Sequence, residues 1–220
     1  MGEDKSNAPL KYEQTAGYWN KVWSKFRYDD RKDVLTSMAD RINSRDYWDN
    51  IWKNPGRRVE KYSMQRAWWC IAREGAKSVL DVGCGNGRLL FPIKDKCEVF
   101  GIDISQVAID RMKNEYGVEG AVMDAYDVDK LERTFDFIVA NHMLEHLYRD
   151  EEFVIKCKAR LNPNGTFFCA VPNNMSGPEE TEEHVRKYDQ KMIEDLLNKV
   201  FGNCEIQIIG NHLIGIAKKC

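Results

Sequence analysis

The stretch that decides the fold runs from residue 79 to residue 90 and reads Val79-Leu-Asp-Val-Gly-Cys-Gly-Asn-Gly-Arg-Leu-Leu90. Its first part is a short apolar run, which is typical of a strand buried on both faces. Three alternating glycines follow, and glycine permits positive φ and close approach of a ligand to the backbone. We expect a helix over about residues 86–94, capped by Asn86 or a neighbour. Strand, turn and helix N-terminus together predict a nucleotide-type pocket at the carboxyl end of a parallel sheet.

The glycine spacing separates two classes of cofactor. Dinucleotide-binding folds show G-x-G-x-x-G, whereas the order here is Asp-x-Gly-x-Gly-x-Gly, starting at Asp81. A carboxylate at this point would repel a pyrophosphate but not a ligand that carries an ammonium group. The stretch resembles motif I of the class I S-adenosylmethionine-dependent methyltransferases. This resemblance implies S-adenosylmethionine as the cofactor, bound by Asp81, Gly83, Cys84 and Gly85.

The composition excludes several classes of protein. The 220 residues carry a net charge of −2, and the pI is about 6.1, which does not favour a general nucleic-acid binder. No apolar run approaches the ~20 residues that span a bilayer. The seven cysteines form no C-x-x-C pair, so we expect reduced thiols in a cytoplasmic protein. The expected partner is a small-molecule acceptor, with neither nucleic acid nor membrane, and the chain would be a monomer or a homodimer.

We expect three parts in the chain: a disordered tail over residues 1–10, an aromatic-rich helical cap over 11–74 and a cofactor-binding domain over 75–220. All six tryptophans precede residue 70. Two interpretations of this concentration stay open: large side chains that dock small helices on the sheet, or a lid whose aromatic faces line the acceptor pocket. The helices expected in the cap cover residues 11–28, 31–43, 44–53 and 57–74.

From residue 77 the pattern alternates between strands and helices, which predicts a mainly parallel sheet covered on both faces. The last two apolar segments, 203–209 and 213–218, would form a hairpin and add an antiparallel strand. The fold class is therefore α/β, a doubly wound sheet with a helical cap, and the family resemblance implies seven strands. The other strands are expected at 78–82, 98–102, 119–123, 135–140 and 166–171, with helices at 105–116, 149–160 and 189–200.

Polar residues at strand ends complete the predicted cofactor site. Asp103 ends the second strand, where a carboxylate can accept both ribose hydroxyls, although NAD-binding folds share this feature. The resemblance implies that Ile104 covers adenine and that Asp124 accepts from the adenine amino group. It also implies that the Ala125 N–H donates to the ring and that Asn141 lies near the methionine ammonium. In the alternative interpretations neither acid binds a ligand: Asp103 would be a favourable negative charge at a helix N-terminus, and Asp124 an ordinary acidic residue of a loop.

The segment His142-Met-Leu-Glu145-His146 follows the fourth predicted strand. Its H-x-x-E-H string matches the inverzincin proteases, but it ends a buried strand instead of lying in a long helix. It resembles the Leu-Glu-His segment of many small-molecule methyltransferases. It also resembles the E-x-x-E-H that helps to bind a divalent cation in coenzyme Q O-methyltransferases and small-RNA 3′-end 2′-O-methyltransferases. His142 replaces their first Glu, so we expect no metal; the alternative is a site made of His142, Glu145, His146 and His184.

Without a metal, His142 or His146 would act as the general base that deprotonates an attacking hydroxyl. Glu145 and His184 complete the predicted catalytic set. A structural alternative is that Glu145 and His146 only cap the next helix. An H-x-x-x-Tyr segment from His184 is common in this family, and with it we predict acceptor binding by Tyr62, Arg186 and Tyr188.

The predicted function is S-adenosylmethionine-dependent methyl transfer to a hydroxyl or amine of a small-molecule acceptor. The sequence lacks an Asn-Pro-Pro-Tyr-like motif after the fourth strand, which argues against methyltransferases of nucleobase amino groups. Two alternatives remain. One is an enzyme similar to the RNA 3′-end 2′-O-methyltransferases, which would need a basic groove. The other is a non-catalytic protein that binds the adenosyl cofactor.

Overall fold

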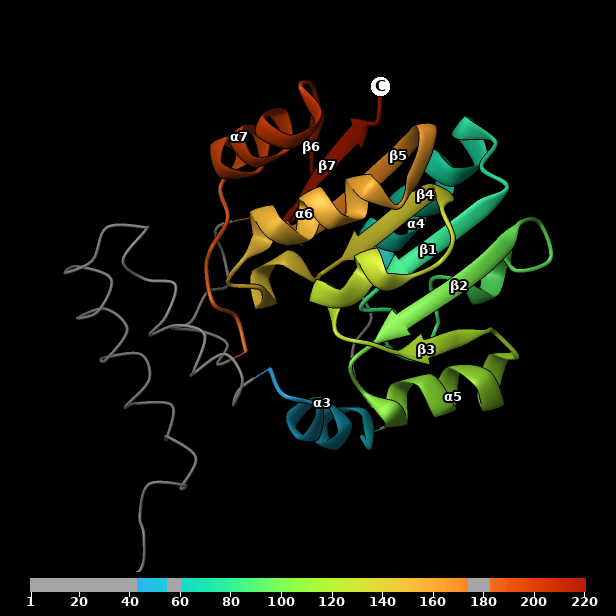
Figure 1. Cartoon of the computed structure of the whole chain (residues 1–220). Coiled ribbons are helices and arrows are strands. Elements are labelled where there is room, and N and C mark those ends of the chain that lie inside the picture. Colours follow the sequence, from blue (N-terminus) through green and yellow to red (C-terminus); the bar gives the residue numbers. More distant parts are fainter. Residues whose placement is uncertain (1–42, 55–60, 174–182) are drawn as a thin grey trace, which may run out of the picture.

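The structure is a computed structural model that describes residues 43–54, 61–173 and 183–220 (Figure 1). Within this part of the chain the strands are β1 (Ser78–Val82), β2 (Glu98–Asp103), β3 (Gly120–Val122), β4 (Phe135–Asn141), β5 (Leu161–Pro172), β6 (Glu205–Ile209) and β7 (His212–Lys218). The α-helices are α3 (Arg45–Trp52), α4 (Lys61–Glu74), α5 (Gln106–Tyr116), α6 (Asp150–Ala159) and α7 (Gln190–Phe201). Three short 3-10 helices are η3 (Phe91–Ile93), η4 (Ala125–Lys130) and η5 (Leu144–His146).

The strands form one seven-stranded sheet in the order β3-β2-β1-β4-β5-β7-β6. β1 to β5 pair in parallel, and β7 runs antiparallel to both β5 and β6. The predicted α/β fold with a seven-stranded, mainly parallel sheet is confirmed, including the terminal hairpin. The strand order reverses between β1 and β4, and in such sheets the carboxyl ends of the strands at the reversal point hold the ligand site.

Helices cover both faces of the sheet, as Figure 1 shows for α6 and α7 on one side and α4 on the other. The first face packs residues such as Phe153 of α6 and Leu197 of α7 against Leu80 and Ile138 of the strands. The second face packs Ala67 of α4 and the neighbouring helix α5 against the opposite sides of the same strands. Successive side chains of a strand enter the two cores in turn, so nearly every residue of the central strands is buried. This explains why these strands are continuous apolar runs in the sequence.

The predicted helix over residues 86–94 is wrong. The chain after the glycine turn forms successive turns and then the single 3-10 turn η3. Gly87 has a φ of 80°, a left-handed conformation that interrupts a right-handed helix. Pro92 lies at the start of η3 and has no N–H to continue the ladder. The expected side-chain cap is absent as well, because the residue that caps η3 is Leu90 and makes no side-chain hydrogen bond.

The N-terminal predictions fall partly outside the described residues. The tail at 1–10 and the helices at 11–28 and 31–43 lie there, whereas the helix expected at 44–53 is present as α3. α4, which we assigned to the cap, shares a buried core with the strands. The division into cap and domain stays a prediction. No helix among the described residues is long and apolar enough to cross a membrane.

Candidate active site

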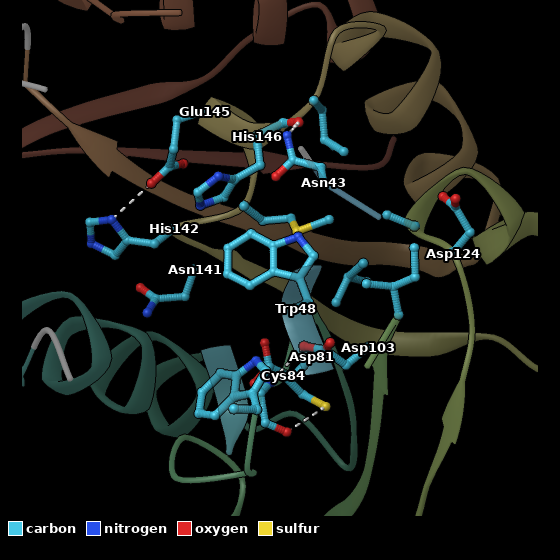
Figure 2. A pocket seen from close by; sticks show the side chains of 18 of the residues that line it. Asn43, Trp48, Asp81, Cys84, Asp103, Asp124, Asn141, His142, Glu145 and His146 are labelled. Atoms are coloured by element: carbon cyan, nitrogen blue, oxygen red, sulfur yellow. Dashed lines mark hydrogen bonds and ion pairs between the residues drawn. The ribbon is translucent and has the colours of Figure 1, made fainter. Parts of the chain in front are cut away.

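A cavity of about 810 Å³ opens at the carboxyl ends of β1, β2 and β4 (Figure 2). Its walls contain all nine residues predicted to bind the cofactor and all four predicted to act in catalysis. They come from strand ends and the loops that follow, as expected at the reversal point of a parallel sheet. These thirteen residues are Asp81, Gly83, Cys84, Gly85, Asp103, Ile104, Asp124, Ala125, Asn141, His142, Glu145, His146 and His184.

The carboxylate of Asp103 joins the two loops that form the floor of the cavity. Its Oδ2 accepts the Gly85 N–H at 2.9 Å, and its Oδ1 accepts the Ser105 N–H at 2.9 Å. Gly85 has a φ of 52°, a left-handed backbone conformation that would be strained in a residue with a side chain. A Cβ there would lie 2.3 Å from the Trp52 ring. Position 85 therefore requires glycine, both for its backbone conformation and for the close approach of Trp52 from α3.

Asp81 is a buried acid beside a second acid. Burial, reinforced by the negative charge of Asp103, raises the pKa of Asp81 to about 8. Its Oδ1 is buried and has no hydrogen-bond partner among the described residues. An unsatisfied buried carboxyl oxygen is costly unless a ligand pairs with it. A cationic or donor group in the cavity would meet this need.

Asp124, just after β3, and Asn141, the last residue of β4, both line the cavity and lie at opposite sides of the view in Figure 2. The Asp124 side chain accepts the Tyr126 N–H at 2.8 Å and caps η4, so the carboxylate is held in place by the backbone. Asn141 ends β4, and its Oδ1 is buried without a hydrogen-bond partner in the described part of the chain. Both side chains therefore keep acceptor capacity for a ligand.

His142 and Glu145 form a bonded pair that lies across the cavity from Asp81 and Asp103 in Figure 2. His142 Nδ1 lies 3.0 Å from Glu145 Oε1, and His142 has a left-handed backbone with a φ of 55°. Burial would raise the pKa of Glu145, but the hydrogen bond from His142 and the charges of His142, His146 and His184 outweigh it and lower the pKa. An ionised carboxylate can only accept, so Nδ1 carries a hydrogen, and in the neutral form of the ring the lone pair is on Nε2.

His146 and His184 lie next to this pair. The Val185 N–H donates to the Glu145 carbonyl at 2.7 Å, which brings the segment after residue 183 against η5. His146 Nδ1 bonds the Glu183 carbonyl at 2.9 Å, and the His146 and His184 rings lie 4.9 Å apart. Burial lowers the pKa of His146, which favours the neutral ring. Ligand atoms of Glu145, His146 and His184 lie within 4.8 Å of one another, so these three could hold a metal ion.

Helix α3 crosses the mouth of the cavity. Asp49 Oδ1 accepts from the Ser105 hydroxyl at 2.5 Å and the Val107 N–H at 3.1 Å, so it binds the start of α5. Trp48 meets the His146 ring edge-on, with centroids 5.0 Å apart. Figure 2 shows the Trp48 indole in the middle of the view, between His146 and the Asp81 and Asp103 carboxylates. α3 has no buried residue, so its aromatic side is only partly covered by protein.

The structure does not bring the three predicted acceptor-binding residues to the cavity. Arg186 Nη1 pairs with Asp150 Oδ2 at 2.5 Å, and the Tyr188 hydroxyl lies 2.8 Å from the same oxygen. These residues fix the segment before α7 to the start of α6, because a buried carboxylate there needs partners. Tyr62 is 65% exposed on α4 and does not line the cavity.

Several cavity residues were missed from the sequence. Trp48 and Trp52 belong to the tryptophan concentration for which docking on the sheet and a lid over the acceptor pocket were both left open, and the pattern did not give the direction of their side chains. Tyr126 and Met143 follow strand ends and carried no polar signal. His212 stood in a predicted hairpin connection, and the only signal was that the chain has four histidines in all.

Comparisons with known proteins agree with this geometry. A family model described as a methyltransferase domain matches residues 52–200, which is more than half of the chain. The fold and the site at the strand ends define a class I methyltransferase. The chain belongs to this methyltransferase family, and the resemblance seen in the glycine motif is confirmed.

The ubiquinone biosynthesis O-methyltransferase of Mesorhizobium japonicum is 33% identical over 101 residues, which are 43% of this chain and 41% of that protein. The chain thus matches less than half the length of this curated relative. The magnesium protoporphyrin IX methyltransferase of Synechocystis, solved with bound S-adenosylhomocysteine, superposes with a TM-score of 0.62 at 13% identity and covers 84% of this chain and 100% of that one. An N-methyltransferase of Bradyrhizobium japonicum, also in complex with S-adenosyl-L-homocysteine, gives a TM-score of 0.61 at 15% identity and covers 80% and 98%.

The raised pKa of Asp81 generates a test of stability against pH. The native state keeps a proton on Asp81 up to about pH 8, whereas the unfolded chain releases it near the ordinary value of 3.8. Between these values the native state binds more protons, so stability falls as pH rises. Asp81→Asn removes this titration, and its stability relative to wild type should rise with pH by up to about 1.4 kcal/mol per unit. Urea unfolding at pH 5, 6, 7 and 8 measures this; a constant difference would contradict it.

Proposed function

We propose that the cavity binds S-adenosylmethionine and that the protein transfers its methyl group to a hydroxyl, or less readily an amine, of a small-molecule acceptor. The observation that carries the proposal is the pairing of two walls in one cavity. One wall has the unsatisfied carboxyl of Asp81 beneath the glycine turn, and the other has the His142–Glu145 pair at 3.0 Å. The first suits a cationic cofactor, which would pair with the carboxylate once Asp81 releases its proton on binding, and the second suits proton removal.

The residues present fit this cofactor. Asp81 Oδ1 and Asn141 Oδ1 are buried acceptors that lack partners among the described residues, and an ammonium group is a donor for such atoms. Each oxygen of Asp103 accepts one backbone N–H, which leaves acceptor capacity for ribose hydroxyls. The cavity also falls within the size range of cofactor sites, about 300–1,000 Å³.

When bound, S-adenosylmethionine supplies a methyl group on a positively charged sulfur, already activated for displacement by a nucleophile. His142 Nε2 would accept the proton of the acceptor hydroxyl as its oxygen attacks the methyl carbon. The carbon–sulfur bond breaks as the carbon–oxygen bond forms, and its electron pair stays on sulfur. Glu145, ionised and bonded to Nδ1, stabilises the imidazolium that results. α3 would exclude water above the reacting groups.

Three observations support an oxygen acceptor of small size. The curated relatives are O-methyltransferases by name. A base adjacent to the cavity is of use to a hydroxyl, which must lose its proton, more than to an amine that is already neutral. The indoles of Trp48 and Trp52 line the cavity, and the sequence has no overall positive charge to hold an RNA end.

Cofactor binding is tested by calorimetric titration with S-adenosylhomocysteine, with NAD as the control ligand. We expect micromolar binding of the adenosyl ligand and none of NAD. Asp103→Asn should weaken binding at least tenfold, because hydrogen bonds to a charged group are worth about 1.5–3 kcal/mol. Asp110→Asn is the matched control, since Asp110 is an exposed acid on α5 that accepts a hydrogen bond from Gln106 and does not line the cavity, and it should leave affinity unchanged. Equal affinities in the two variants would contradict the assignment of Asp103.

The base is tested by His142→Gln in a methyl-transfer assay with radiolabelled S-adenosylmethionine and a panel of phenols, catechols and primary amines. We expect turnover of a phenolic acceptor to fall about 10²- to 10⁴-fold, the usual contribution of a general base. Affinity for S-adenosylhomocysteine should stay the same, because Asp81 and Asp103 lie on the other wall. Turnover that persists in His142→Gln would remove this residue from the chemistry.

A metal-assisted reaction is the second candidate, and one geometric observation favours it. Glu145 Oε2 is buried without a hydrogen-bond partner in the described residues and belongs to the cluster with His146 and His184. The Glu183 carbonyl holds the hydrogen on His146 Nδ1, so its Nε2 is available as a ligand. Two imidazoles and one carboxylate suit zinc or manganese better than magnesium.

Metal titration separates this candidate from the metal-free base. If the cluster binds metal, calorimetry should show one Zn²⁺ or Mn²⁺ per chain and weaker binding of Mg²⁺. Glu145→Gln and His184→Asn should each weaken binding tenfold or more, whereas Glu115→Gln, an exposed acid paired with Arg111, should not. Full activity after dialysis against a chelator, together with no metal binding, would leave only the metal-free mechanism.

A further inference from the structure

The four histidines of the chain all line the same cavity. Three of them, His142, His146 and His184, come from segments already placed in the site. The fourth is His212, the first residue of β7, which reaches the cavity from the antiparallel end of the sheet. Nothing in the proposed mechanism uses it so far. The His212 side chain is titratable, is only 8% exposed and lies in the wall of the candidate active site. Such residues are candidates for a functional role.

His142 needs external support to stay in place. It follows the last residue of β4, and its φ of 55° is unusual for a residue that has a side chain. Its N–H donates to the Ala170 carbonyl at 2.8 Å, which fixes the backbone but not the ring. The Glu145 bond to Nδ1 fixes one edge of the imidazole. That bond by itself does not set the plane of the ring.

The His212 ring supplies a second contact. Its centroid lies 5.0 Å from that of His142, and the two planes meet at 84°, an edge-to-face geometry. The backbone beneath it is well anchored, since His212 pairs with Pro172 of β5 and with Ile209 of β6. The adjacent Asn211 carbonyl also accepts the Asn173 N–H at 2.9 Å. His212 is thus a ring on a fixed strand that abuts a ring on a strained loop.

We propose that His212 is a positioning residue for His142. Its flat ring holds the plane of the His142 imidazole, so that Nδ1 keeps its bond to Glu145 and Nε2 keeps one direction for the proton of the acceptor. The proposal rests on the function proposed above for His142. It assigns the role to the shape of the ring and not to its nitrogens. Rigid support of this kind matters because a misplacement of about 1 Å in a reacting group can cost about 10²-fold in rate.

The test compares His212→Phe with His212→Leu. Both side chains are apolar and of a size to fill the same buried position, but only phenylalanine presents a flat ring. In a proton–nitrogen correlation spectrum of the imidazoles, four histidines give four sets of signals, which single His→Gln variants assign. We expect wild type and His212→Phe to show His142 with its hydrogen fixed on Nδ1. His212→Leu should show exchange between the two tautomers. Unfolding midpoints in urea verify that both variants are folded.

Turnover gives the second measurement, with the acceptor found in the panel. We expect His212→Leu to lower kcat about tenfold with unchanged affinity for S-adenosylhomocysteine, and His212→Phe to stay within about threefold of wild type. The proposal is overturned if His212→Phe is as impaired as His212→Leu, since a nitrogen would then be required. A rise in acceptor KM alone would overturn it too. If wild type methylates no acceptor while the spectra change as expected, the proposed function fails and the positioning role stands.

Discussion

The site depends on the carboxylate of Asp103, which binds the Gly85 and Ser105 N–H groups at the same time. These two donors belong to the loops after β1 and β2, so one side chain sets the distance between neighbouring strand ends. The Ser105 hydroxyl then accepts the Ala108 N–H and caps α5, and the same hydroxyl donates to Asp49 of α3. The glycine turn, the helix that follows β2 and the helix over the cavity are therefore placed by one connected set of polar contacts.

This arrangement places a second acid, Asp81, in a buried position beside Asp103, which is unfavourable for the ionised form of Asp81. Burial raises the pKa of Asp81 to about 8, and the negative charge of the neighbouring Asp103 adds to the rise. A buried acid without a hydrogen-bond partner costs stability, and the ligand-binding role proposed for Asp81 would explain its presence there. The left-handed backbone of His142 and the burial of Glu145 also cost stability, and the function proposed for this pair would explain both.

The fold was predictable because its signals are local. Buried parallel strands appear in the sequence as apolar runs. Ser105 is a typical helix N-cap and predicted the start of α5, where its side chain accepts the Ala108 N–H. The prediction failed where two local signals competed. Leu89, Leu90 and Ile93 suggested a helical face, but Gly87 in a left-handed conformation and Pro92 without an N–H prevent a regular helix. The three apolar residues are buried all the same, as part of the core under α4.

The sequence by itself determined which residues line most of the cavity, because many of them lie at or just after a strand end and parallel strands bring such ends to one edge. Only the tertiary structure decided what faces them. It placed His212 against His142 and Trp52 over Gly85, and it directed Arg186 and Tyr188 to Asp150 instead of the cavity. These contacts join segments that are distant in the chain. Their geometry follows from sheet order and helix docking, which no local pattern of residue types encodes.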